Sequence, residues 1–323
     1  MTGYVEQTLF PGKRAPLCIV RNGSEQPLSE YVGDHRAGLE SKLAEHGAIL
    51  FRGFKVDGAA AFSEFVGATG DRSLDYRFGS TPRTLVSDKI YTSTEYPANR
   101  EIPLHNENAY LASWPDRLAF CCVTPSERGG ETPIADMRDV TRSISAELMD
   151  RFGQARVEYV RHFHPGIDLS WNQVFQTSDP DAVAKTCAAN GIRFDWIGED
   201  GSLLRTSQIC QGVACHPVTG ERVFFNQAHL FHATSMGPEI AKELRNVFGA
   251  DRLPRHARYG DGSEIPDEVI AGIHTAFRSH AVAFPWQAGD VLWLDNMQVA
   301  HGRRPYRGER RILAALMESS HAA

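Results

Sequence analysis

The stretch VLWLDNMQVAH, residues 291–301, decides the fold. Its four leading apolar residues predict a buried strand, the polar pair after them predicts a corner, and His301 follows that corner. A second stretch, LHNEN at residues 104–108, places His105 and Glu107 two residues apart. On a β-strand such side chains leave the same face, about 6.5 Å apart along the backbone, whereas on a helix they diverge by about 200°. We therefore expect His105 and Glu107 on one strand and His301 on another.

Two imidazoles and one carboxylate are the ligand set of a mononuclear iron site. They leave the other positions of an octahedral ion open, as in non-haem Fe(II) oxygenases. Because the chain contains 13 histidines, a His-x-Glu pair alone arises readily by chance. The hypothesis depends on an ordered set of motifs: Gly-Gly-Glu-Thr at residues 129–132, Trp-x-Asp-Asn at 293–296, then His301, then two arginines at 310 and 311.

This set of motifs resembles the TauD/TfdA family of Fe(II)/2-oxoglutarate-dependent dioxygenases, over roughly residues 49–317. The resemblance implies a mainly β fold with flanking helices, built on a double-stranded β-helix, which is a cupin-like jelly roll. It implies Fe(II) as cofactor and 2-oxoglutarate and O₂ as co-substrates, with release of succinate and CO₂. The short β-like runs of the sequence agree with that fold.

The resemblance also assigns roles to individual residues. It implies that His105, Glu107 and His301 are the catalytic residues that bind the metal. It implies that Thr132 and Arg311 bind the 2-oxoglutarate carboxylate, for which a guanidinium offers a planar fork of donors that lysine lacks. The neighbouring arginines are expected to be solvated charges on loops or at a strand edge; these are Arg303, Arg304, Arg307 and Arg310.

Two positions narrow the reaction. Glu107 stands where many relatives carry Asp and where halogenating relatives carry Gly or Ala. An intact carboxylate therefore favours hydroxylation over halogenation. Ala315 stands where sulfonate-oxidising relatives carry a further arginine, so taurine is not the expected substrate.

Three segments resemble the branch that includes syringomycin-type aspartyl hydroxylases and other tailoring enzymes of natural products: residues 103–107, 129–136 and 224–231. That resemblance implies hydroxylation of an unactivated C–H bond of an amino acid, free or tethered to a carrier protein, in antibiotic biosynthesis. Polar residues near the metal motif or in the middle region are candidate substrate contacts, and a basic one would suit a substrate carboxylate. They are Asn108, Tyr110, Arg205 and Asn226.

Other interpretations stay open from the sequence alone. The same oxidant can desaturate or cyclise a substrate instead of hydroxylating it. A zinc-dependent hydrolase or isomerase on a cupin-like barrel would use the same three ligands, but it leaves Thr132 and Arg311 without a role. A small-molecule binder without catalysis would not need a complete ligand set.

The composition is that of a globular protein, with 42% hydrophobic and 23% charged residues in 323. A net charge of −6, without a long run of one sign, disfavours nucleic acid and membrane surfaces as partners. Six cysteines without a C-x-x-C pair, and a first segment without signal-peptide features, lead us to expect reduced thiols in a cytoplasmic protein. No apolar run approaches the roughly 18 residues of a membrane span. The oligomeric state stays open, including a homo-oligomer.

The chain is expected to form one dioxygenase domain over residues 1–323, with a lid-like insertion at approximately 137–209. Apolar spacing and turn residues set the expected elements. Helices are predicted at 31–45, 59–68, 143–151 and 181–190, and strands at 48–54, 116–123, 222–225, 282–284 and 291–294.

Overall fold

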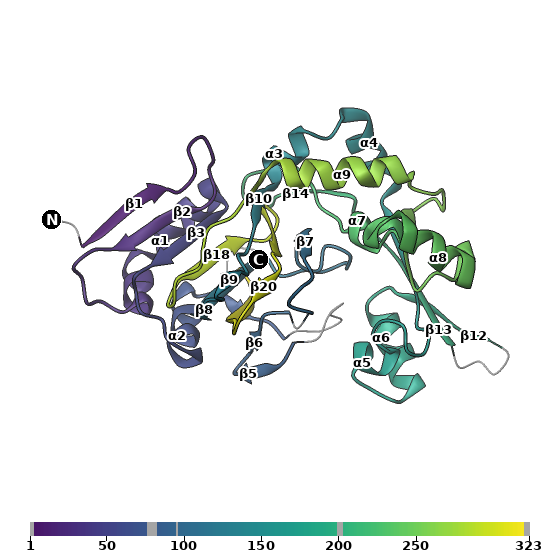
Figure 1. The fold of residues 1–323 in the computed structure, drawn as a ribbon, viewed down its shortest axis with the longest axis horizontal. Coiled ribbons are helices and arrows are strands. Elements are labelled where there is room, and N and C mark those ends of the chain that lie inside the picture. Colours follow the sequence, from purple (N-terminus) through teal and green to yellow (C-terminus); the bar gives the residue numbers. More distant parts are fainter. Residues whose placement is uncertain (1–2, 76–82, 95, 199–202, 320–323) are drawn as a thin grey trace.

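A large mixed sheet forms the core of one side of the molecule (Figure 1). The computed structural model describes residues 3–75, 83–94, 96–198 and 203–319. Within them the sheet runs in the order β1-β2-β3-β18-β8-β21-β6-β5, and β4 pairs with β21. Its strands are β1 (Tyr4–Thr8), β2 (Leu17–Arg21), β3 (Ala48–Arg52), β4 (Arg72–Ser73), β5 (Leu85–Ser87), β6 (Ile90–Thr92), β8 (Arg117–Thr124), β18 (Val291–Asp295) and β21 (Arg311–Glu318).

Two helices, α1 (Leu28–His46) and α2 (Ala59–Thr69), cover one face of this sheet (Figure 1). Helix α1 ends at Gly47, whose backbone is left-handed with a φ of 74°. A Cβ at this position would lie 2.7 Å from a Val299 methyl group, so only glycine fits, and β3 starts at the next residue. The predicted helices at 31–45 and 59–68 are confirmed, and the strand predicted at 48–54 is observed but ends at Arg52.

The other face of the large sheet packs against a smaller sheet in the order β17-β10-β19-β7. Strand β18 explains its own apolar sequence, because Val291 and Trp293 pack under the helices while Leu292 and Leu294 pack between the sheets. A strand buried on both faces loses the alternation of polar and apolar residues. The smaller sheet consists of β7 (Ile102–His105), β10 (Ile134–Asp136), β17 (Ala281–Val282) and β19 (Val299–Arg303).

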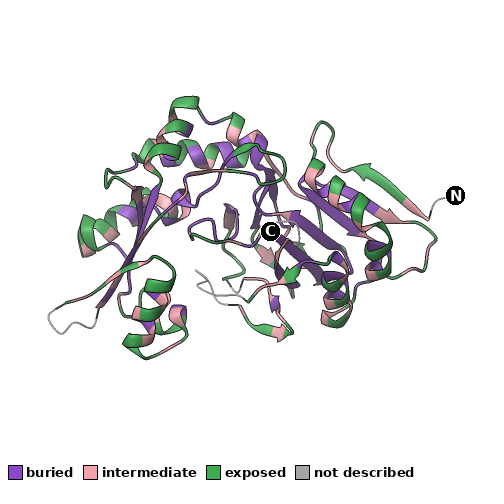
Figure 2. Ribbon diagram, turned by 180° about the vertical axis from the view of Figure 1, so that it is seen from behind, coloured by how far each residue is buried: buried purple, intermediate pink, exposed green. Residues whose placement is uncertain are grey.

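A second lobe is built on an antiparallel sheet in the order β12-β13-β11-β16. Helices α5 (Trp171–Phe175) and α6 (Pro180–Ala189) pack on this sheet, and Figure 2 shows that they expose their outer faces while the central strands of both lobes are largely buried. Two short ribbons, β9 with β20 and β14 with β15, complete the described strands. The strands are β9 (Arg128–Gly129), β11 (Val157–His162), β12 (Arg193–Ile197), β13 (Leu203–Cys210), β14 (Val213–Cys215), β15 (Arg222–Phe224), β16 (Arg255–Tyr259) and β20 (Tyr306–Arg307).

Several short helices surround the lobe sheet and join it to the core. They are α3 (Met137–Arg142), α4 (Ala146–Ala155), α5 (Trp171–Phe175), α6 (Pro180–Ala189), α7 (Ala228–Phe231), α8 (Pro238–Phe248) and α9 (Asp267–Ser279), with 3₁₀ turns at Ala233–Met236 and Ala250–Arg252. The helix predicted at 143–151 starts later, because the Ser145 hydroxyl accepts a hydrogen bond from the Leu148 N–H and caps α4. The strand predicted at 282–284 ends at Val282.

The remaining predicted elements are observed: the helix at 181–190 is α6, and the strands at 116–123, 222–225 and 291–294 are β8, β15 and β18. All six cysteines are free thiols, and Cys215 is exposed. Among the helices of the described ranges, none has the length and hydropathy to span a membrane. Together, the strands and helices described above give the predicted mainly β architecture with flanking helices.

Candidate metal centre

Two histidines face each other across neighbouring strands. His105 closes β7, and His301 lies in the middle of β19. The strands pair in antiparallel fashion with His105 opposite His301, and the two ring centroids lie 4.6 Å apart. Glu107 departs from the prediction, because β7 ends at His105 and Glu107 lies in the turn that follows. Strand alternation does not bring this carboxylate to the histidines, so another contact must place it.

Asn296, in the corner between β18 and β19, fixes the backbone of Glu107. Its Oδ1 accepts a hydrogen bond from the Glu107 N–H (2.7 Å), and its Nδ2 donates to the Glu107 carbonyl oxygen (2.9 Å). Asp295 holds the same corner, because its Oδ1 accepts from the N–H groups of Met297 and Gln298. The polar pair of the corner therefore ties the turn that carries Glu107 to the strand that carries His301.

The three side chains form a compact cluster whose ligand atoms lie within 4.8 Å of one another. Glu107 and His301 are buried. His105 Nδ1 bonds to the Pro103 carbonyl oxygen at 2.8 Å, which leaves its Nε2 available to the cluster. His301 Nε2 lies 3.6 Å from Glu107 Oε2. Two imidazole nitrogens and one carboxylate oxygen this close together suit one divalent iron ion.

The electrostatics of the cluster favour the protonation states that a metal ion needs. Arg83 donates from Nη2 to Glu107 Oε2 at 2.7 Å. Burial alone would raise the pKa of Glu107, but Arg83 and the two imidazoles hold that pKa well below its usual range. Burial, followed by the charge of His301, lowers the pKa of His105 to about 4. Near neutral pH the carboxylate is therefore ionised and the His105 imidazole is neutral, as metal binding requires.

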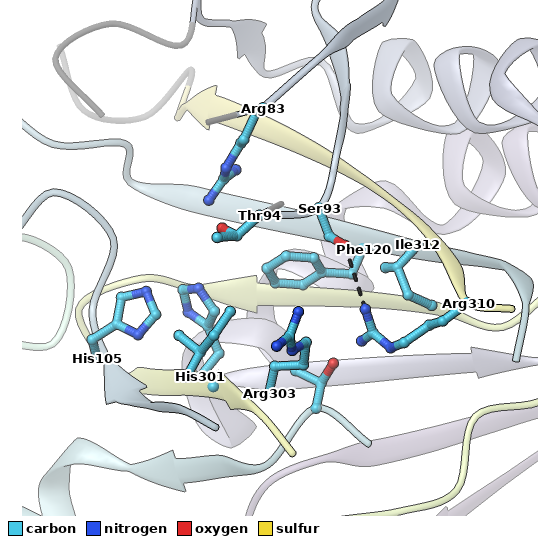
Figure 3. Close-up of a pocket in the computed structure, with 12 residues that line it drawn as sticks. Arg83, Ser93, Thr94, His105, Phe120, His301, Arg303, Arg310 and Ile312 are labelled. Carbon is cyan, nitrogen blue, oxygen red and sulfur yellow. Dashed lines mark hydrogen bonds between the residues drawn. The ribbon is translucent and has the colours of Figure 1, made fainter. Parts of the chain in front are cut away.

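A cavity of about 390 Å³ opens beside the two histidines (Figure 3). Phe120 of β8 and Ile312 of β21 form part of its apolar wall. Arg303, Arg310 and Thr132 bring polar groups to it. The cavity is thus a partly open space with guanidinium and hydroxyl groups beside the proposed metal ligands.

Arg310, and not Arg311, lies in this cavity. Arg311 is exposed, whereas Arg310 points inward, donating from Nε to the Gly130 carbonyl oxygen (2.9 Å) and lying 3.4 Å from the Ser93 hydroxyl (Figure 3). The prediction for Arg311 therefore has to be corrected, together with the expectation that Arg310 is a solvated charge. Arg310 and Ile312 both line the cavity, whereas Arg311 does not. Strand β21 begins at Arg311, and its pairing with β8 shifts register between Arg311 and Ile312, so the sequence alone does not show which arginine faces inward.

Thr132 and Gly130 shape the part of the cavity wall beside Arg310. Thr132 is buried, and its Oγ1 accepts a hydrogen bond from Trp286 Nε1 at 3.1 Å, which leaves the hydroxyl proton free to donate. Gly130 has a φ of 73°, and a Cβ there would lie 3.0 Å from the Arg310 side chain. Glycine at this position therefore allows Arg310 to pass beside the loop.

The four predicted substrate contacts lie in different places. Tyr110 lines a second cavity in the lobe. Asn108 is buried in the turn after Glu107, with a φ of 56°, and its Oδ1 has no hydrogen-bond partner. Asn226 is fully buried and bonds to the Gly212 carbonyl oxygen and the Ala228 N–H, which is a structural role. Arg205 pairs with Asp195 at 3.2 Å and lines neither cavity.

Sequence reasoning missed several residues of the cavity, among them Arg83, Phe120 and Arg303. Arg83 and Phe120 belong to no motif, although Phe120 sits in a predicted strand. Arg303 was expected to be a loop charge, yet it is 5% exposed and donates to the carbonyl oxygens of Tyr96, Pro97 and Arg100. Arg304 and Arg307 are exposed, as predicted.

Residues 20–317 match the family model described as taurine catabolism dioxygenase TauD, TfdA family. The chain belongs to this family. It is 40% identical over 315 residues to the dapdiamide synthesis protein DdaC of Enterobacter agglomerans, covering 98% of this chain and 94% of that protein. It is also 33% identical over 288 residues to a clavaminate synthase-like protein of Arabidopsis thaliana, covering 86% and 83% of the two chains.

Solved structures of low sequence identity share the fold. PvcB of Pseudomonas aeruginosa, described as an Fe, alpha-ketoglutarate dependent oxygenase from an isonitrile synthetic pathway, superposes with a TM-score of 0.57 at 15% identity, covering 98% of this chain and 92% of that chain. A putative alpha-ketoglutarate-dependent taurine dioxygenase of Burkholderia xenovorans gives 0.56 at 14% identity, with 98% and 93% covered. The predicted enzyme class is confirmed: this is a dioxygenase of a family that uses Fe(II) and 2-oxoglutarate, and the His-Glu-His cluster fits that cofactor.

Proposed function

We propose that this protein hydroxylates an unactivated C–H bond of an amino acid, or of an aminoacyl group tethered to a carrier protein, in the biosynthesis of a natural product. The chemistry is supported above all by the enclosed cluster of His105, Glu107 and His301 beside a cavity that contains Arg310. The substrate class is supported by the 40% identity, over nearly the whole chain, to a dapdiamide synthesis protein.

In this proposal His105, Glu107 and His301 hold Fe(II) through two imidazole nitrogens and one carboxylate oxygen. The iron, together with 2-oxoglutarate, supplies the oxidation of a C–H bond by O₂ with release of succinate and CO₂. Arg310 binds the carboxylate of 2-oxoglutarate in place of the predicted Arg311, because a half-buried guanidinium that lines the cavity is a strong partner for a carboxylate. Burial, followed by the charge of Arg303, lowers the pKa of Arg310 to about 10, so Arg310 remains charged at neutral pH.

The neighbouring side chains position and enclose the reactants. Thr132 donates its hydroxyl proton to the same carboxylate, while its oxygen accepts from Trp286. Asn296 keeps Glu107 in register with His301 through the two hydrogen bonds to the Glu107 backbone. Phe120 and Ile312 exclude water from the cavity wall. The chain's own contribution is thus orientation and a dry site rather than proton transfer.

The two lobes have separate tasks in this proposal. The facing sheets are the two sides of a double-stranded β-helix that carries the ligands. Residues 137–209 are a lid-like insertion within one domain that spans residues 1–323. The contact of Tyr110, just after the metal turn, with Tyr159 of this insertion supports the arrangement, with ring centroids 6.2 Å apart.

A coupled assay tests the proposal. Iron-loaded protein receives 2-oxoglutarate and O₂ with each amino acid, both free and loaded on a carrier protein, and succinate and product mass are measured together. We expect succinate to form in step with a product that has gained one oxygen atom. A product that has lost two hydrogens would replace hydroxylation by desaturation or cyclisation. No succinate from any substrate, in protein shown to contain iron, would overturn the proposed activity.

A further inference from the structure

A second cavity, of about 400 Å³, lies in the lobe on the sheet β12-β13-β11-β16. Strand alternation creates its floor. Tyr159 and Arg161 of β11 and Phe163 just beyond it are two residues apart in turn and face the same side. On the neighbouring β13, Thr206 pairs with Arg161 and Gln208 pairs with Tyr159, and both also line the cavity.

The other walls of this cavity are mostly apolar. They come from the chain after the metal turn, from helices α5 and α7, and from the segment before β12. The residues are Tyr110, Leu111, Val174, Phe175, Ile192 and Phe231. A largely apolar cavity lined by a few convergent polar groups is the usual form of a small-molecule site.

Arg161 is the charged residue of the cavity lining and is only 8% exposed. Its Nη2 has no hydrogen-bond partner and lies 3.6 Å from Asp168 Oδ2. Asp168 is shared: it forms this long ion pair with Arg161, and its Oδ1 accepts a hydrogen bond from Arg255 Nη2 at 2.5 Å. The Arg161 guanidinium also lies over the Phe163 ring, 4.7 Å from its centroid. A buried guanidinium with an unsatisfied donor destabilises the fold and calls for a ligand that completes it.

The charge of Arg161 defines that ligand. Burial, followed by the charge of Arg255, lowers the pKa of Arg161 to about 10, which leaves the guanidinium protonated at neutral pH. A carboxylate is ionised at the same pH and matches the planar fork of donors. Aromatic walls on either side accommodate an apolar group next to the carboxylate.

Two chain segments lead from the metal cluster to this cavity. Tyr110 follows Glu107 by three residues, so their Cα atoms are no more than about 11 Å apart. In the second segment Gln227 donates to the Asn106 carbonyl oxygen at 2.6 Å, and Phe231, four residues later, lines the cavity. The cavity wall is therefore one short turn of chain away from the proposed iron ligands.

We propose that this cavity is a subsite for a carboxylate at one end of an extended, dipeptide-sized substrate whose other end is oxidised at the metal cluster. The proposal rests on the proposed oxygenase function and narrows its substrate. Each extended residue covers about 3.3–3.6 Å, so two residues with their end groups approach the roughly 11 Å upper limit on the separation of the Glu107 and Tyr110 Cα atoms.

Affinity selection tests the subsite without turnover. The full chain, loaded with Fe(II) and 2-oxoglutarate under nitrogen, is incubated with a pool of dipeptides, with the same pool as C-terminal amides, and with those amides capped by an N-terminal succinyl group. Retained compounds are identified by mass spectrometry. We expect the carboxylate-bearing compounds to bind about 10-fold to 100-fold more tightly than the neutral amides. Which of the two acidic pools is retained shows the end that carries the carboxylate.

Arg161→Gln is expected to remove the preference for acids, and Arg205→Gln is its matched control. Arg205 lies on the same sheet, but it pairs with Asp195 and lines neither cavity, so that variant keeps the preference. A second variant, Thr206→Glu, places a carboxylate on the residue that pairs with Arg161 across the sheet. This carboxylate occupies the subsite and pairs with the Arg161 guanidinium, so the buried charge of Arg161 stays compensated. Circular dichroism and melting temperature confirm that each variant is folded.

Three results would overturn the subsite. They are equal retention of acids and amides by the wild-type chain, unchanged acid preference in Arg161→Gln or Thr206→Glu, and no retained compound in any pool. The wild-type chain forming succinate alongside any of these results would leave the oxygenase function intact and reject only the subsite. Conversely, acid preference that depends on Arg161 in a chain that forms no succinate would retain the subsite and reject the proposed reaction.

Discussion

The described part of the chain brings two imidazoles and a carboxylate together in two places. One cluster is His105, Glu107 and His301 in the core; the other is His232, His256 and Glu264 in the lobe. In the core the carboxylate is buried and its backbone is clamped by Asn296. In the lobe the Glu264 side chain is 65% exposed, and its Oε2 bonds directly to His256 Nε2 at 2.7 Å.

The difference shows that ligand type alone does not make a metal site. Glu107 is oriented by groups outside the cluster, so its carboxylate is preorganised toward the histidines beside a cavity. In the lobe cluster, Glu264 Oε2 is already hydrogen-bonded to His256 Nε2, and His232 Nδ1 bonds to the Thr234 hydroxyl at 2.8 Å. The lobe cluster therefore serves as a hydrogen-bonded brace, while the core cluster is arranged to hold an ion.

The largest effect is expected when the carboxylate of each cluster is replaced in turn. Glu107→Gln keeps the size of the side chain but removes its charge, so we expect iron affinity to fall by at least roughly 100-fold, the upper end of losses from positioning residues alone. Succinate formation should fall below detection. Glu264→Gln is the matched control and should keep both within two-fold of wild type, roughly. Metal analysis after dialysis and the succinate assay provide the readouts; iron retained by Glu107→Gln and lost by Glu264→Gln would reverse the assignment.

The next effect separates the two adjacent arginines. Arg310→Lys keeps the charge but loses the planar fork, so we expect the KM for 2-oxoglutarate to rise about 10-fold to 100-fold with a smaller change in kcat. Arg311→Lys changes an exposed side chain and should leave KM nearly unchanged. Steady-state kinetics over a range of 2-oxoglutarate concentrations measure both. A rise in KM confined to Arg311→Lys would restore the original assignment.

The proposed metal ligands could be named from the sequence because each lies in a short motif next to a strong strand signal. The apolar run of β18 and the polar corner after it indicate His301 as a ligand, and the His-x-Glu spacing indicates His105 and Glu107. The local structure around Glu107 could not be predicted. Its position depends on Asn296, 189 residues away, and strand alternation suggested a wrong geometry for it.

The sequence could not show whether Arg310 or Arg311 faces the cavity, because the strand that follows them is buried on both faces. Residues 312–317 of β21 are buried on both faces, so the apolar pattern gives no sign of which face meets the cavity. Arg161 was missed for a different reason. Its cavity combines side chains from distant segments, and only the fold shows that a charged residue among them is enclosed. They include residues 110, 159, 161, 163, 206, 208 and 231.

The smallest effect tests the lobe brace through pH. Burial, followed by the neighbouring His256, lowers the pKa of His232 to about 4, against about 6.5 in an unfolded chain. The folded state therefore binds this proton less readily, so its stability is complete above pH 6.5 and falls as the pH drops toward 4. At pH 5 the penalty is on the order of 2 kcal/mol, and His232→Gln should escape it. Both proteins are melted in a calorimeter at pH 7.5 and at pH 5. At pH 7.5 we expect the variant to be less stable than the wild type, because the hydrogen bond to Thr234 is lost. At pH 5 the difference in stability between the two proteins should be smaller. A gap of constant size would mean that His232 keeps an ordinary pKa, and the brace would then not depend on a neutral imidazole.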